Sequence, residues 1–247
     1  MKMGLQLPAE HLKPSLKSKH RGFTMAEVLI TLGIIGIVAA LTIPQLIKNY
    51  QHKELEAAFK KHYSMLAQAI THMDADGLCT VYDCYSSNKD FYRNITMYFK
   101  VVKYCEDMYG IEVDEYDKFC FPKSSNDTKY TNYTRKSSYV SSFLFDDGQF
   151  YTADGALYTL ERNASYKAIL IGVDVNGRMK RPNALGHDVF VFQLTKNGSI
   201  GVLVPMGADG TQYDKDTYCS KTSTNVLNGV GCAVKALGEK DYFKNLP

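Results

Sequence analysis

The sequence predicts an α+β fold, in which a long N-terminal helix packs on an antiparallel β-sheet head. Residues 28–47 are an uncharged apolar run, and apolar residues then recur at intervals of three and four to about Ala75, the period of a helix. From Ser138 onward the pattern alternates in short segments, and Asp-Gly and Asn-Gly pairs recur between them. Such pairs favour the tight turns of β-hairpins, which predicts the sheet.

The apolar run, Val28 to Ile47, has the length and composition of a transmembrane helix. A helix of about 20 residues at 1.5 Å per residue extends roughly 30 Å, the thickness of the hydrocarbon core of a bilayer. The residues before the run carry five Lys or Arg and one Glu up to Gly22, a basic flank that should stay on the cytoplasmic side. We therefore expect a single-pass topology, with the rest of the chain facing outward.

A lone carboxylate, Glu27, lies at the entrance of this run. A charged group inside a membrane is costly unless it has a partner, so an intramembrane Glu indicates a function. The alternative is that Glu27 reaches back to the cytoplasmic interface, where its charge stays hydrated at small cost.

The order of residues around this carboxylate is specific. The basic leader ends in Gly22, and Phe23 follows it. Glu27 is the fifth residue after that junction, and Pro44 interrupts the apolar helix. This arrangement resembles the N-terminus of the type IV prepilin and pseudopilin family, over about residues 19–75. The resemblance implies a pilin-like fold, cleavage after Gly22 by a prepilin peptidase, and N-methylation of Phe23.

The resemblance also implies how the chain acts. The uncut protein would span the inner membrane once with its head in the periplasm, and the cut protein would join copies of itself or other pilins in a filament. Glu27 would set the subunit register by pairing with the new amine of a neighbouring Phe23. The filament would be a pilus at the cell surface, used in adhesion, motility or DNA uptake, or a periplasmic pseudopilus of type II secretion. Nucleic acid is a partner only in the DNA-uptake case.

Two other interpretations fit the same N-terminus. An ordinary secretory signal peptide also joins a basic region to an apolar one, and Val38-Ala39-Ala40 resembles its cleavage site, although the apolar run continues beyond it. A plain uncleaved anchor would need no glycine before Phe23. With such an anchor, the alternative function is a membrane-anchored extracytoplasmic binding module that does not polymerise.

The predicted organisation has four parts. Residues 1–22 are the cleaved leader, and residues 23–75 are the helix, with its membrane part at about 28–47. Residues 76–135 form a connecting region that is rich in Cys and Tyr and contains a short helix. Residues 136–247 form the antiparallel β head and end in a disulfide-bearing region.

Individual elements follow from the periodicity. The long helix should pack on the head through a recurring stripe: Leu55, Phe59, His62, Leu66, Ile70 and Met73. The short helix should present Phe91, Ile95, Tyr98, Phe99 and Val102. Strands are expected at 142–145 with 149–152, at 166–173, and at 189–194 with 200–204. Pro44 removes one backbone donor and should kink the long helix.

All six cysteines lie beyond the membrane run, where an oxidising compartment favours disulfides. The sequence does not select one pairing, but short loops favour three pairs: Cys79–Cys84, Cys105–Cys120 and Cys219–Cys232. Zinc is the rival interpretation, although no Cys-x-x-Cys pair occurs. The net charge of +3 falls to −1 without residues 1–22, because these carry five Lys or Arg and one Glu. The basic character therefore indicates topology and not nucleic-acid binding.

One loop contains candidate metal ligands. Asp174, Asn176 and Asp188 offer oxygen atoms around glycines, and calcium takes about six to eight oxygen ligands. The rival interpretation is a structural loop, because Asp, Asn and Gly are also the residues of plain turns. Calcium is the one cofactor that the sequence suggests.

The sequence offers little for an enzyme. It contains no Gly-x-Ser-x-Gly elbow, no His-Glu-x-x-His pair and no phosphate-binding glycine loop. His187 and Asp188 are an isolated adjacent pair, for which a role in a turn is the simpler interpretation. The sequence therefore predicts a structural subunit without catalytic residues.

Overall fold

The computed structural model divides the chain into two compact units, residues 1–47 and residues 48–247. The helix α1, Met25–Ala75, contributes to both units. The predicted leader lies outside the described residues, except for Gly22. The structure describes residues 22–86, 88–105, 120, 130–137, 144–145 and 147–247.

The helix α1 contains a segment that is long and apolar enough to cross a membrane, and none of that segment is buried within the protein. Pro44 lies inside α1 and does not end it. In the second unit, α1 buries the predicted stripe together with Ala69, so the helical periodicity is confirmed there. The buried residues of α1 are Leu55, Phe59, His62, Leu66, Ala69, Ile70 and Met73.

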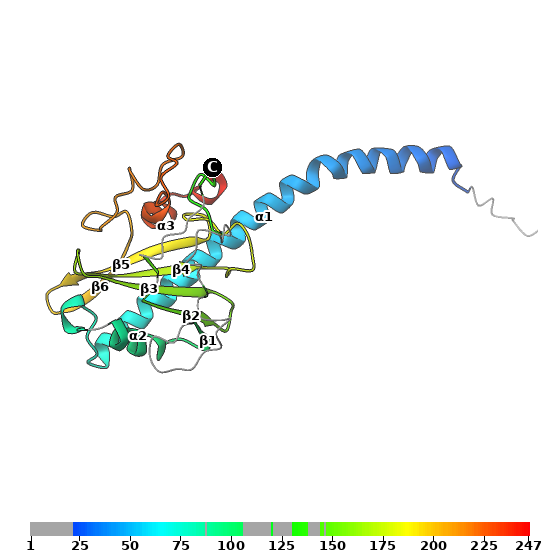
Figure 1. The fold of residues 1–247 in the computed structure, drawn as a ribbon. Helices are drawn as coiled ribbons and strands as arrows, with labels where there is room; N and C mark the ends of the chain where they lie inside the picture. The colour runs from blue at the N-terminus through cyan, green and yellow to red at the C-terminus, as the bar shows by residue number, and fades with distance from the viewer. Residues whose placement is uncertain (1–21, 87, 106–119, 121–129, 138–143, 146) are drawn as a thin grey trace, which may run out of the picture. The chain divides into compact units, whose positions relative to one another are not determined.

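The second unit contains an antiparallel sheet in which each strand pairs with the next along the chain (Figure 1). This arrangement confirms the predicted α+β class. Its strands are β1 Val101–Cys105, β2 Gly148–Thr152, β3 Leu157–Asn163, β4 Ala168–Asp174, β5 Val189–Asn197 and β6 Ile200–Pro205. The predicted hairpin around Asn197-Gly198 is formed by β5 and β6, with Asn197 opposite Ile200.

Both faces of the sheet are covered. On one face, the ring centroid of Phe59 in α1 lies 4.4 Å from that of Phe190 in β5 and 5.8 Å from that of Phe243 near the C-terminus. On the other face, β4 contributes Leu170 to a second buried cluster that includes Leu185. Every residue of β4 is therefore buried, which explains its nearly continuous apolar sequence.

Two predicted elements are wrong in detail. Helix α2, Asn88–Thr96, ends before Val102, which lies in the strand β1. The strand β2 pairs with β1 and β3, whereas the prediction paired it with residues 142–145. Within that predicted partner, Leu144 and Phe145 are not in a strand, and the other two residues lie outside the described part of the chain.

Short helices and disulfides complete the described head. The disulfides join the same three pairs that short loops favoured: Cys79–Cys84, Cys105–Cys120 and Cys219–Cys232. Because every cysteine is paired, the zinc interpretation is wrong. The short helices are η1 Tyr82–Cys84, η4 Val230–Cys232, α3 Ala233–Gly238 and η5 Phe243–Asn245.

Candidate functional site

The start of α1 brings the predicted processing and assembly residues together. Gly22 and Phe23 precede the helix in non-helical backbone, and the Phe23 side chain is 88% exposed within the protein. Thr24 and Glu27 bond to each other. The Thr24 N–H and Oγ1–H each donate to Glu27 Oε2 at 2.8 Å, and the Glu27 N–H donates to Thr24 Oγ1 at 3.2 Å.

This reciprocal pattern is a capping box, in which a Thr before the first turn and a Glu three residues later satisfy otherwise unpaired backbone N–H groups. The first intrahelical bond then runs from the Val28 N–H to the Thr24 carbonyl at 3.2 Å. Sequence reasoning missed the role of Thr24, although the Thr-x-x-Glu spacing was a readable signal for it. These bonds therefore orient Glu27 at the helix start within a single chain.

One oxygen of this carboxylate is left for another partner. Both Thr24 donors use Oε2, and no hydrogen bond to Oε1 of Glu27 is found within the described part of the chain. Thr24, whose N–H caps Glu27, directly follows Phe23, so an amine created at Phe23 would lie one residue before the capping N–H. Pro44 lies 17 residues further along α1, about 26 Å at 1.5 Å per residue, and takes no part in this cluster.

An apolar N-terminal helix with an exposed, capped start and an α+β head is the architecture of a pilin-like protein. Residues 17–43 match the family model described as the prokaryotic N-terminal methylation motif, the signature of type IV prepilins and pseudopilins. The motif indicates a type IV pilin- or pseudopilin-like precursor. Neither the curated proteins nor the solved structures include a significant match to the chain.

The predicted metal loop contains two buried carboxylates, and both make hydrogen bonds. Oδ1 of Asp174 accepts from the Gly177 N–H at 2.8 Å, and its Oδ2 accepts from the Tyr130 hydroxyl at 2.6 Å. Asp188 accepts the backbone N–H groups of Asn183 and Ala184, each at 2.7 Å. These bonds are those of a structural loop that ties the ends of β4 and β5 together.

The two carboxylates influence each other. Burial raises the pKa of Asp174 to about 6, and burial together with the charge of Asp174 raises the pKa of Asp188. A proton or a cation would relieve this pair. The side-chain oxygens of Asn176 and Asn183 are also buried without a hydrogen-bond partner among the described residues. In the described part of the chain, no group of three or more His, Cys, Asp or Glu residues is arranged to hold a metal ion. Calcium binding by this loop thus stays a hypothesis.

The isolated His187-Asp188 pair lies in the turn before β5. His187 is buried, its Nε2 lies 2.8 Å from the Tyr133 carbonyl, and burial lowers its pKa to about 4. Both residues are thus engaged with the backbone of the head, as a turn role predicts.

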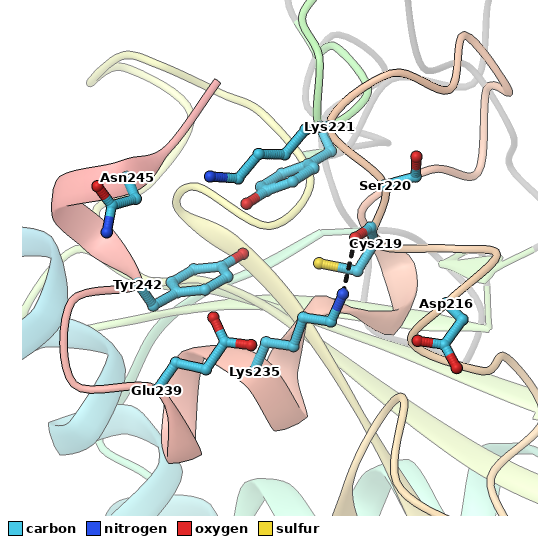
Figure 2. Close-up of a pocket in the computed structure, with 9 residues that line it drawn as sticks. Asp216, Cys219, Ser220, Lys221, Lys235, Glu239, Tyr242 and Asn245 are labelled. Carbon is cyan, nitrogen blue, oxygen red and sulfur yellow. Dashed lines mark hydrogen bonds between the residues drawn. The ribbon is translucent and has the colours of Figure 1, made fainter.

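A polar pocket of about 420 Å³ lies near the C-terminus (Figure 2). The Lys235 ammonium, from α3, donates to the Cys219 carbonyl at 3.1 Å on one wall, and Glu239 is the residue that follows α3. The charged side chains that line the pocket have opposite signs, so they do not select one kind of ligand. The lining residues are Tyr133, Asp216, Cys219, Ser220, Lys221, Lys235, Glu239, Tyr242 and Asn245.

Proposed function

We propose that this protein is a subunit of a type IV pilus-like or pseudopilus filament. A prepilin peptidase cuts it after Gly22 and methylates Phe23, and the freed chain leaves the inner membrane to pack its N-terminal helix against copies of itself or other pilins. The observation that carries this proposal is the methylation motif at residues 17–43, joined to the uncharged apolar segment of α1.

The geometry of Glu27 supports the assembly step. Its Oε2 caps its own helix, while its Oε1 is available to accept the cationic amine of Phe23 from a neighbouring subunit. The attraction between the two charges is strong in an apolar filament core, because the dielectric constant there is low. Either charge alone would be costly in that core, so each group requires the other as its partner. Glu27 would then select the register at which one subunit joins the next.

The intact mass of the mature protein tests the processing step. We expect the loss of residues 1–22 and the gain of one methyl group on Phe23. A mature chain that begins near Ala40 would instead identify a secretory signal peptide, and an unchanged N-terminus would identify a plain anchor. Either mass would overturn the proposal.

Substitution of Glu27 tests the assembly step. Glu27→Gln keeps a side-chain oxygen that can accept the capping-box hydrogen bonds and removes the negative charge. We expect this variant to be cut and methylated normally. Its amount in sheared or purified filaments should fall at least ~10-fold, because the lost ion pair contributes more than about 1.4 kcal/mol.

The matched control is Thr24→Val, which removes the cap and leaves the Glu27 charge in place. It should weaken the first turn by about 1 kcal/mol and still enter filaments. If Glu27→Gln assembles as well as the native chain, the register role is wrong and a non-polymerising anchored module is favoured. If Thr24→Val fails as severely as Glu27→Gln, helix capping and not charge is what assembly requires.

A further inference from the structure

The connection between β4 and β5 carries a basic tip, residues 178–181, with the sequence Arg-Met-Lys-Arg, in which Arg178 is half-buried and the other three residues are exposed. Met179 is 93% exposed, the highest value for a large apolar side chain in the part of the chain that the structure describes. Single exposed apolar residues are ordinary on protein surfaces. Met179 differs because cationic residues flank it on both sides.

Hydrogen bonds hold this tip in place. The Asn176 side-chain amide donates to the Arg181 carbonyl at 3.3 Å, and the Asn183 amide donates to the Arg178 carbonyl at 2.9 Å. The Lys180 N–H donates to the Gly177 carbonyl at 2.9 Å. Met179 is therefore presented at the surface by a turn that is tied at both ends, so little ordering would be required for it to bind a partner.

The tip lies at a defined end of the second unit. Lys180 Nζ lies 3.8 Å from a carboxylate oxygen of Glu54 in α1, and both side chains are more than half exposed. Such a surface pair contributes little stability, but it locates the tip. Glu54 follows Lys48 by six residues, about 9 Å along the helix, and Lys48 is the first residue after the apolar run.

This position suits contact with a membrane surface. The headgroup layer extends roughly 5 to 8 Å beyond the hydrocarbon core on each side. Lys and Arg can lay their aliphatic stems along an apolar surface while the charged ends reach phosphates. The exposed cations at this end include Lys48 and Lys53 of α1 as well as Lys180 and Arg181. Arg178 instead donates to the Cys120 carbonyl at 3.2 Å.

We propose that the 178–181 tip docks on the anionic phospholipid headgroups of the membrane that holds the apolar run. Lys180 and Arg181 pair with lipid phosphates, and Met179 enters the interface between headgroups and acyl chains. The contact rests on the proposed membrane insertion of residues 28–47. It would steady the head of the membrane-held subunit, and it must break when the subunit is extracted into a filament.

A nucleic acid is the other polyanion that such a tip could meet. The observations favour lipid. The exposed apolar side chain of Met179 can enter a membrane interface, whereas a phosphate backbone offers it no apolar contact. The chain without its leader also has a net charge of −1, which does not attract a polyanion over long range.

The absence of tryptophan from the chain allows a direct test. Met179→Trp places a single fluorescent reporter at the tip of the full-length protein, reconstituted into vesicles of phosphatidylcholine with or without ~30% phosphatidylglycerol. With phosphatidylglycerol we expect the emission to shift to shorter wavelength and brominated lipid to quench it. Screening by salt should reduce both effects, because the Debye length falls to about 3 Å at 1 M. Flotation of the vesicles separately reports whether the apolar run inserts.

The matched control is Tyr166→Trp, since Tyr166 is 63% exposed and lies in the turn before β4, at the opposite end of that strand. Its emission should not depend on phosphatidylglycerol. In the Met179→Trp background, Lys180→Gln with Arg181→Gln should abolish most of the shift. Neutralising Lys167 and Lys196, which lie at the far end of the sheet, should preserve it.

Three results would overturn the docking proposal. The first is a protein that floats with the vesicles while its Met179→Trp emission is the same in both lipids. The second is an equal response from Tyr166→Trp. The third is a Met179→Trp response to a short DNA duplex but not to phosphatidylglycerol, which would assign the tip to nucleic acid. A protein that does not float would refute the membrane insertion on which the proposal rests.

Discussion

His62 is a polar residue within the otherwise apolar stripe of α1. Its Nδ1 lies 2.8 Å from the Tyr158 hydroxyl, and its Nε2 lies 3.8 Å from Asp154 Oδ2. Burial lowers the pKa of His62, while the charge of Asp154 acts in the opposite direction with less effect. His62 is tolerated there because the Tyr158 hydroxyl of β3 lies within hydrogen-bonding distance of one ring nitrogen, and the Asp154 carboxylate, in the turn between β2 and β3, lies near the other.

Asp154 completes this polar contact between α1 and the sheet. Burial opposes its ionisation, but hydrogen bonds from Lys61 and Thr152 outweigh burial and lower its pKa to about 2. Lys61 Nζ lies 2.5 Å from Asp154 Oδ2, and Thr152 donates to Oδ1 at 2.6 Å. The carboxylate therefore stabilises the fold above pH ~4, and this contribution is lost as the pH falls toward 2.

The lowered pKa of His62 predicts a loss of stability in mild acid. Above pH ~6.5 the ring is neutral in both the folded and the unfolded chain. As the pH falls below that value the unfolded chain binds the proton more readily, so the free energy of unfolding decreases. His62→Gln, which can still bond to Tyr158, should flatten the decrease between pH 7 and 5 in urea titrations.

His72→Gln is the matched control, because His72 lies on the exposed surface of the same helix. It should leave the pH dependence of unfolding as it is in the native protein. An unchanged pH dependence in His62→Gln would show that another group, such as the buried His187, is responsible for the acid sensitivity.

At the scale of elements, the contact between α1 and the sheet is dominated by aromatic rings. Phe59 is fully buried, and its ring centroid lies within 6.1 Å of those of Phe190, Phe192 and Phe243. These rings come from α1, from β5 and from the C-terminal η5, so one side chain joins three parts of the head. Its spacing of four residues from Leu55 and of three from His62 was visible in the sequence, whereas its partners were not.

Phe59→Ala should therefore destabilise the head by about 3–5 kcal/mol, the usual range for deletion of a buried Phe. The denaturant midpoint of unfolding measures it, with the slope of the transition checked for two-state behaviour. Lys60→Ala is the matched control, because Lys60 is exposed and forms a helix-surface pair with Glu56 at 2.6 Å. Its effect should stay within about 0.5 kcal/mol. Equal effects of the two substitutions would contradict the packing described here.

The region between α2 and β1 shows where local pattern fails. The apolar spacing through Phe99 and Val102 suits a helix, and the prediction extended α2 across it. In the structure Val101 instead pairs with Thr152 of β2, about fifty residues later in the chain. A local period cannot report a partner so far away, and short apolar runs fit a helix and a strand equally well.

At the scale of the whole molecule, calcium would act as a ligand of the folded state only. At 100 times its dissociation constant it would add about 2.7 kcal/mol to the free energy of unfolding. For a protein of this size that corresponds to a rise in Tm of roughly 5–10 °C. The oxygens of Asp174 already accept from the Gly177 N–H and the Tyr130 hydroxyl, and those of Asp188 accept from two backbone N–H groups, so we expect the structural loop to need no metal.

Melting curves of the purified full-length protein in calcium and in EDTA measure this directly. We expect the two Tm values to agree within about 1 °C. A rise of several degrees with calcium, removed by EDTA and absent in Asp188→Asn, would establish the metal site and assign the unpartnered oxygens of Asn176 and Asn183 to it. Magnesium serves as the control ion, because it demands a tighter octahedral set of ligands.

The sequence by itself determined the features of this protein that depend on neighbouring residues. The basic leader, the Gly22–Phe23 junction, the apolar run and the alternating strands are properties of contiguous residues, and charge, hydropathy and periodicity report them directly. The tertiary structure alone decided which strand pairs with β2, that Asp174 and Asp188 are buried together, and that Lys180 lies beside Glu54. Those contacts join residues that are distant in the chain, and only packing, burial and backbone hydrogen bonding in the folded head bring them together.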